Sequence, residues 1–85
     1  MAKPSPPPPS EVLIRVGGNV RRLRKAMEDG PSQEKLGEMA ECHRTYVSQL
    51  ERGKTNISVD RLDRFAQIFG VDIAELFVVT PPVED

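Results

Sequence analysis

Apolar residues recur along this chain at helical spacing, in short stretches separated by capping residues, glycine and proline. The first stretch spans residues 11–29, follows the capping residue Ser10 and ends before the Gly30-Pro31 pair. One side of a helix here would be apolar, formed by Val12, Val16, Val20, Leu23 and Met27. The pattern therefore predicts a first helix with one buried stripe.

Two adjacent glycines, Gly17 and Gly18, stand in the middle of this first helix. Each weakens a helix by about 1 kcal/mol relative to alanine. They indicate either a close approach by another backbone or a helix that becomes firm only after them.

The next two helices are predicted in residues 33–41 and 43–52. Ser32 caps the first of them, whose apolar positions are Leu36, Met39 and Ala40. Gly53 fits the left-handed position just past the end of the second. A connection this short makes two helices cross steeply, as in a helix-turn-helix.

Two more helices complete the pattern. Ser58 caps residues 59–69 and Gly70 ends them; the expected buried face comprises Leu62, Phe65, Ala66 and Phe69. Asp72 and Glu75 have the spacing of a capping box for a last short helix over residues 73–77. Strand-like alternation is confined to residues 77–80, so the chain is predicted to be all-α, with five short helices.

The helix predicted in residues 43–52 has an unusual polar side. At about 100° per residue, an arc of about 140° holds only guanidinium, hydroxyl and amide groups. We call this arc the polar ridge; it consists of Arg44, Thr45, Ser48, Gln49 and Arg52. Tyr46, Val47 and Leu50 lie on the opposite side and would anchor the helix.

The chemistry of the polar ridge matches the base edges of the DNA major groove. Arginine pairs with guanine O6 and N7, glutamine pairs with adenine N6 and N7, and the threonine methyl contacts thymine. The alternative is an ordinary exposed helix face, which would normally carry lysine and glutamate. Neither residue type occurs on the ridge, so DNA reading is the favoured interpretation.

Composition limits the remaining choices. Eighty-five residues make one small domain, which is marginally stable alone and gains from a partner subunit. The net charge of -1 conceals an asymmetry: residues 1–56 carry +3 and residues 57–85 carry -4. A polarised chain can present a basic face to a polyanion while staying near neutral overall, although a mixed solvated surface explains the same numbers.

Catalytic or metal chemistry has little support in the sequence. Cys42 and His43 are the only residues of their types, and neighbouring residues do not face each other on a helix. We expect Cys42 to fill the core under the turn and His43 to cap the following helix. We therefore predict a protein that is no enzyme and needs no metal, no cofactor and no small-molecule ligand.

The remaining expectations concern location and the termini. One cysteine favours a reducing, intracellular setting, and no apolar run approaches the ~20 residues that span a membrane. We expect a cytoplasmic protein, associated with the nucleoid when it is bound to DNA. Residues 1–10 are proline-rich and predict a disordered tail, or less simply a ligand for a proline-recognition domain.

Three sequence segments together resemble the Cro/repressor-type helix-turn-helix family, also called the Xre family. They are "SQEKLGEMA" at 32–40, "YVSQLERGKTN" at 46–56 and "LDRFAQIFGVDIAELF" at 62–77. "VGGNVRRLRKAM" matches more loosely, and the resemblance covers about residues 15–77. It implies a five-helix, lambda-repressor-like domain in residues 11–79, with an acidic tail in residues 80–85. It also implies binding to double-stranded operator DNA as a symmetric homodimer.

The resemblance also assigns roles to single residues. Arg44, Thr45 and Gln49 match base-contacting positions, with Ser48 as a further candidate. The phosphate-binding positions match Gln33, Tyr46, Arg52, Lys54 and Asn56. The alternatives are that Gln33 simply starts its helix, that Lys54 is a solvated loop charge and that Tyr46 only packs.

A structural ion pair is implied as well. Glu51 matches a family glutamate that pairs with an arginine of the first helix, here Arg24. Such a pair fixes the angle of the recognition helix and has no catalytic role.

Three departures from the family pattern concern turns. The "EDGP" link after the first helix is about two residues longer than usual, which shifts that helix or extends a loop. Glu41 and Cys42 stand where the family often has glycine and valine, so Glu41 must adopt a conformation that glycine takes more easily. Ile57 replaces a common proline.

The expected function is that of a small prokaryotic or phage transcriptional regulator, usually a repressor, similar to the controller proteins of restriction–modification systems. The dimer interface is predicted from leftover apolar residues, which we call the C-terminal apolar patch: Val71, Ile73, Phe77, Val78 and Val79. These residues alternatively only close the core beneath the last helix. The competing function is a protein-interaction adaptor or antitoxin-like module on the same fold.

Overall fold

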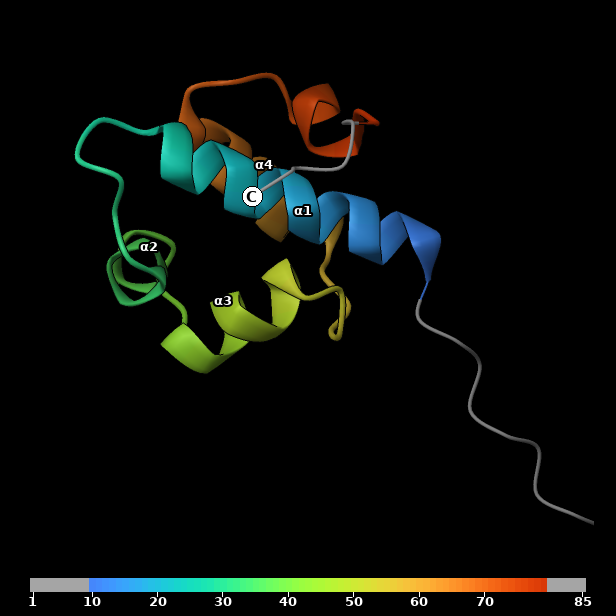
Figure 1. The fold of residues 1–85 in the computed structure, drawn as a ribbon, viewed down its shortest axis with the longest axis horizontal. Coiled ribbons are helices and arrows are strands. Elements are labelled where there is room, and N and C mark those ends of the chain that lie inside the picture. Colours follow the sequence, from blue (N-terminus) through green and yellow to red (C-terminus); the bar gives the residue numbers. More distant parts are fainter. Residues whose placement is uncertain (1–9, 80–85) are drawn as a thin grey trace, which may run out of the picture.

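The computed structural model describes residues 10–79. These residues form four α-helices and one 3-10 helix: α1 (Glu11–Ala26), α2 (Gln33–Met39), α3 (Arg44–Glu51), α4 (Val59–Phe69) and η1 (Ile73–Phe77) (Figure 1). The all-α prediction is confirmed for this part of the chain, but the prediction of a fifth α-helix was wrong. The last element is only five residues long, a length at which the tighter 3-10 geometry is common. The predictions for residues 1–9 and 80–85 lie outside the described residues.

Local capping determines where the helices begin. The hydroxyl oxygens of Ser10, Ser32 and Ser58 accept hydrogen bonds from the backbone N–H three residues on, as predicted. Asp72 caps η1 by accepting from the Ala74 N–H at 2.8 Å. The predicted capping box is incomplete, however, because the Glu75 carboxylate lies 3.8 Å from Arg22 Nη2 instead of turning back to the Asp72 backbone.

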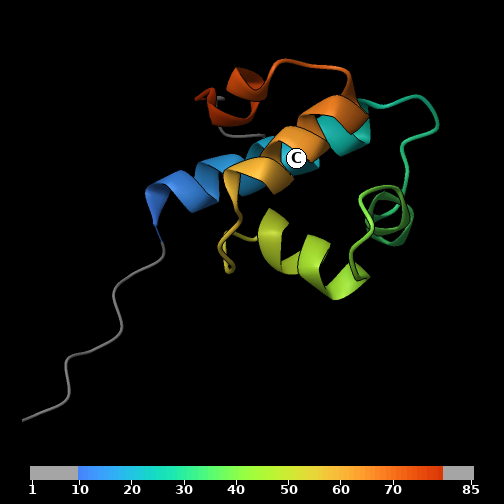
Figure 2. The same cartoon turned by 180° about the vertical axis from the view of Figure 1, so that it is seen from behind.

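The core joins all five elements. Its buried side chains are Val16, Val20, Leu36, Ala40, Val47, Leu50, Leu62, Phe65, Ala66 and Leu76. Two apolar residues expected to be buried are instead exposed, Val12 and Met39. The first turns of α1 extend past the ends of α3 and α4 (Figures 1 and 2). Val12, in the first of these turns, is 49% exposed.

The glycine pair in α1 has one structural role, and Gly17 performs it. A Cβ atom on Gly17 would overlap Leu50 O and lie 2.9 Å from Glu51 O, so α1 and α3 meet backbone to backbone. Gly18 faces open space. The close-approach interpretation is confirmed, and a late start of the helix was wrong because α1 is continuous from Glu11.

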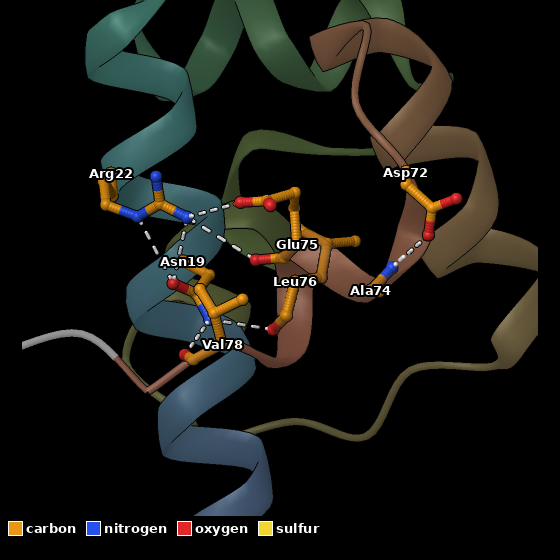
Figure 3. Close-up of polar contacts among 7 residues, drawn as sticks. All are labelled: Asn19, Arg22, Asp72, Ala74, Glu75, Leu76 and Val78. Atoms are coloured by element: carbon orange, nitrogen blue, oxygen red, sulfur yellow. Dashed lines mark hydrogen bonds and ion pairs between the residues drawn. The ribbon is translucent and has the colours of Figure 1, made fainter.

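The C-terminal segment is held on α1 by Asn19, a buried polar residue that the sequence pattern did not reveal. Its Nδ2 donates to Leu76 O at 2.9 Å and to Val78 O at 2.8 Å (Figure 3). Its Oδ1 accepts from Arg22, whose guanidinium also reaches the Glu75 carboxylate. The backbone carbonyls at the end of η1 thereby find donors inside the protein.

The central position of α1 separates two surfaces. Both views of the fold place α3 on one side of α1 and η1 on the other (Figures 1 and 2). A partner that covers η1 therefore leaves α3 free.

Candidate nucleic-acid interface

Helices α2 and α3 are joined by residues 40–43 and cross steeply, as predicted: α2 is seen end-on where α3 lies across the view (Figure 1). The turn is closed by the Cys42 N–H, which donates to Gly37 O at 2.8 Å. A Cβ atom on Gly37 would lie 2.7 Å from Cys42 O, so this close contact requires glycine. Glu41 takes φ +57°, the left-handed conformation that was expected in the absence of glycine.

The polar ridge lies on the outer surface of α3. The side chains of Arg44, Thr45, Gln49 and Arg52 are exposed, while Ser48 is half-buried. On the opposite side of the helix, Val47 and Leu50 are fully buried in the core. Helix α3 is therefore anchored by an apolar edge and presents a guanidinium, hydroxyl and amide row to solvent.

Both ends of α3 are capped. At the start, His43 Nδ1 accepts from the Thr45 N–H at 3.0 Å and lies 3.0 Å from Thr45 Oγ1, so the predicted cap is confirmed. At the end, Gly53 takes φ +70° and the Lys54 N–H donates to Gln49 O at 2.9 Å. Arg52 Nε donates to Ser48 O at 3.3 Å and satisfies a carbonyl of the last turn.

A buried carboxylate fixes α3 against its neighbours. Arg24 Nε donates to Glu51 Oε2 at 2.7 Å and Arg24 Nη2 donates to Glu51 Oε1 at 3.0 Å. Gln33 Nε2 donates to the same Oε1 at 3.1 Å, and Arg24 Nη1 donates to Pro31 O at 2.9 Å. The bond to Glu51 raises the pKa of Arg24, against the effect of burial. Helices α1 and α2 thus both donate to one residue of α3, and Arg24 also holds the loop before α2.

The margin of the ridge carries an aromatic–cation contact. Arg61 of α4 places its guanidinium carbon 5.3 Å from the centre of the Tyr46 ring, and the Tyr46 hydroxyl donates to Asn56 O at 3.1 Å. Arg61 did not figure among the predicted site residues. Its positive charge at the start of α4 was the only signal in the sequence, and the fold brings it to α3.

The half-buried Cys42 thiol lies beside the same cation. Burial raises the pKa of Cys42, and the charge and hydrogen bond of Arg61 partly counter this effect. Cys42 and Ile57 pack against the core, as do other partly buried apolar residues. The expectation that Cys42 fills space under the turn is confirmed in part, because its side chain packs against the core but is only partly buried. Burial also raises the pKa of Tyr46.

The other predicted phosphate-binding residues lie around α3. Lys54 and Asn56 are exposed on the loop that follows the helix, and Gln33 is half-buried at the start of α2. The Gln33 amide nitrogen is engaged by Glu51. Gln33 thus braces α3 through a contact made within the protein itself.

The C-terminal apolar patch is divided between two environments. Val71 and Ile73 are partly buried against the core, and Val78 is half-buried. Phe77 and Val79 retain 40% and 76% of their surface exposed. Two residues of the patch therefore help to close the core, and two are available to a partner.

In residues 10–79, no three histidine, cysteine or acidic residues are grouped as metal ligands would be. No helix in this part of the chain combines the length and the apolar character that crossing a membrane requires.

Helices α2 and α3 are short, cross steeply and are joined by a tight turn, and the second of them is braced and exposes a polar ridge. This arrangement defines a helix-turn-helix protein. The family model described as "Helix-turn-helix" matches residues 20–76. The chain belongs to this family, in its Xre-type branch.

Relatives and solved structures agree with this assignment. The chain is 35% identical to the control protein C.MunI of Mycoplasma over 80% of this chain and 90% of that protein. It is 34% identical to the control protein C.BamHI of Bacillus amyloliquefaciens over 84% of this chain and 86% of that one. The crystal structure of the restriction–modification controller protein C.AhdI from Aeromonas hydrophila superimposes with a TM-score of 0.69 at 35% identity, over 76% and 91% of the two chains. The protein is thus a DNA-binding transcriptional regulator of the controller-protein type.

Proposed function

We propose that this protein binds a palindromic operator as a homodimer, with α3 of each copy in the major groove, and represses transcription by occupying promoter DNA. The observation that carries the proposal is the exposed polar ridge on a helix whose other edge is buried. An α-helix fits the major groove, and the outer residues of such a helix meet the base edges.

Base reading is assigned to four residues of the ridge: Arg44, Thr45, Ser48 and Gln49. Arg44 and Gln49 are exposed and carry the side chains that pair bidentately with guanine and adenine. Thr45 lies beside Arg44 in the first turn of α3, the part of a recognition helix that usually contacts bases. Ser48 is half-buried, so its hydroxyl has a narrower approach to DNA.

Phosphate binding is assigned to the residues around the ridge: Gln33, Tyr46, Arg52, Lys54 and Asn56. We add Arg61 to this set, because its exposed guanidinium lies over Tyr46. Phosphate contacts position a protein on the duplex without carrying sequence information. They also release counterions, so affinity should fall steeply with salt.

Homodimerisation is assigned to the C-terminal apolar patch, in particular to Phe77 and Val79. The patch lies across α1 from the ridge, so pairing through η1 leaves both copies of α3 free to meet DNA (Figures 1 and 2). A two-fold dimer would place the two α3 helices on half-sites about 10 bp apart. With the ridge and the dimer surface in one small domain, protein concentration would control occupancy, as in an autoregulated controller.

Selection of bound sequences from random duplex DNA tests the proposal in one experiment. The full chain should recover a sequence with two related half-sites, and binding to it should weaken as salt rises. An adaptor that retained the fold would bind all duplexes alike or none, and that outcome would overturn DNA reading. A recovered site with a single half-site would overturn only the homodimer.

A further inference from the structure

The first turn of α3 contains a contact between two side chains that capping alone does not require. His43 Nδ1 accepts from the Thr45 N–H at 3.0 Å, and the same nitrogen lies 3.0 Å from Thr45 Oγ1. Both residues are exposed, and Thr45 belongs to the polar ridge.

The backbone bond determines the state of the imidazole. A nitrogen that accepts from an N–H carries no proton, so an imidazole that makes this cap holds its proton on Nε2. An unprotonated Nδ1 cannot donate, so in the 3.0 Å hydrogen bond with Thr45 Oγ1 the hydroxyl is the donor, and it shares the one lone pair of Nδ1 with the backbone N–H. The single O–H donor of Thr45 is therefore used within the protein.

This arrangement changes what Thr45 offers to solvent. A free threonine hydroxyl rotates and serves as donor or acceptor, whichever the partner needs. With its hydrogen directed to His43, Thr45 Oγ1 has only acceptor lone pairs to present. In the major groove, adenine N6 and cytosine N4 are the base-edge donors, whereas guanine O6 and thymine O4 are acceptors.

We propose that His43 is a specificity-determining residue that fixes Thr45 as a hydrogen-bond acceptor. Thr45 thereby selects a base with an amino group, adenine or cytosine, at the position that it faces. This inference rests on the proposed DNA reading by α3. A histidine that only caps the helix would affect stability and overall affinity without favouring any base.

The test compares His43→Ser with Thr45→Val. Serine caps three other helices of this fold through the N–H three residues on, so His43→Ser keeps α3 capped while it frees the Thr45 hydroxyl. Thr45→Val removes the hydroxyl and retains the side-chain shape. Circular dichroism and thermal unfolding establish that both full-length variants are folded.

Binding is measured on a series of operators derived from the one that the wild-type chain selects. In this series each position carries each of the four base pairs in turn. Thr45→Val identifies the base pair that Thr45 reads. There, His43→Ser should lower the preference for the amino-bearing base two- to tenfold, about the worth of one hydrogen bond. At the positions where the control variant Arg44→Ala changes the base preference, His43→Ser should keep the wild-type preference. The double variant should show no change beyond that of Thr45→Val alone.

Several results would overturn the proposal. A uniform loss of affinity, or an unchanged preference, would reduce His43 to a cap while leaving DNA reading by α3 intact. A wild-type chain that selects no sequence would remove the proposed function and this inference together. Nitrogen NMR of the only imidazole in the chain gives an answer even if His43→Ser does not fold. In the neutral ring the proton should be found on Nε2 in the free and DNA-bound protein, and a neutral ring protonated on Nδ1 would end the proposal.

Discussion

Arg24 and Glu51 face each other through two parallel hydrogen bonds of 2.7 and 3.0 Å, with only 12% and 2% of their side-chain surfaces exposed. The pair joins the last turn of α1 to the last residue of α3. Gln33 completes the surroundings of the carboxylate from α2. The orientation of the polar ridge relative to the rest of the domain thus depends on one buried charge and its donors.

Removing either partner should destabilise the domain strongly. Arg24→Ala leaves the Glu51 carboxylate buried with Gln33 as its remaining side-chain donor, and loss of one member of a buried pair costs about 3–5 kcal/mol. Glu51→Ala should cost a similar amount, and the double variant less than the two single costs together. Urea unfolding of the four proteins measures this coupling. Additive costs would show that the pair does not act as a unit.

Gly17 and Gly18 should respond oppositely to alanine. Gly17→Ala drives a methyl into the backbone of α3 and should destabilise the domain by about 1–3 kcal/mol. Gly18→Ala meets nothing within 4 Å and should stabilise α1 by about 0.5–1 kcal/mol. Thermal unfolding of the two variants, each the control of the other, distinguishes them. Equal destabilisation would contradict the close approach of α1 and α3.

Features that depend on neighbouring residues were predictable from the sequence. Ser10, Ser32 and Ser58 cap through an N–H three residues away, and Gly53 and Gly70 take positive φ at helix ends. The outward position of the ridge followed from helical periodicity. Periodicity alone failed for Val12, because it identifies the apolar side of a helix and does not indicate where the neighbouring helices end.

Features that depend on residues far apart in the chain were not predictable in this way. Asn19 bonds to Leu76, 57 positions away, and nothing near Asn19 in the sequence marks it as a buried polar residue. Arg61 reaches Tyr46 only because the fold brings the start of α4 near α3. The Arg24–Glu51 pair is also distant, and it was expected only because the sequence resembles a known family.

Asn19 should control the position of the C-terminal apolar patch. Asn19→Ala removes the donor from two backbone carbonyls, and an unsatisfied buried polar group costs about 1–3 kcal/mol. We expect lower stability and, if the patch forms the dimer interface, weaker self-association in sedimentation. Arg22→Ala is the milder control, because its contacts are long, 3.3 Å to Asn19 and 3.8 Å to Glu75, and its side chain is 36% exposed. Unchanged stability in Asn19→Ala would mean that η1 docks without these bonds.

The Cys42 thiol should react slowly with alkylating agents near neutral pH. The thiolate is the nucleophile, and burial raises the pKa of Cys42 despite the neighbouring Arg61. Since the thiol ionises at lower pH in the unfolded chain than in the folded one, its contribution to stability is present below the ordinary cysteine pKa. That contribution is lost as pH rises toward the higher pKa of the folded state.

Iodoacetamide labelling against a free thiol standard measures the rate at which Cys42 is alkylated. Arg61→Ala should slow the labelling further, and a faster rate would contradict the assigned effect of Arg61.

Base-reading and phosphate-binding residues should differ in how their loss affects DNA binding. Arg44→Ala or Gln49→Ala should weaken binding to the selected operator by about 1–3 kcal/mol and relax the preference at the base pair that each residue reads. Lys54→Ala should weaken binding to all duplexes alike and lower the slope of log affinity against log salt by about 1. Titrations of the operator and of a scrambled duplex at several salt concentrations separate the two classes. A Lys54→Ala variant that changes sequence preference, or an Arg44→Ala variant that weakens both duplexes equally, would reverse the assignment of that residue.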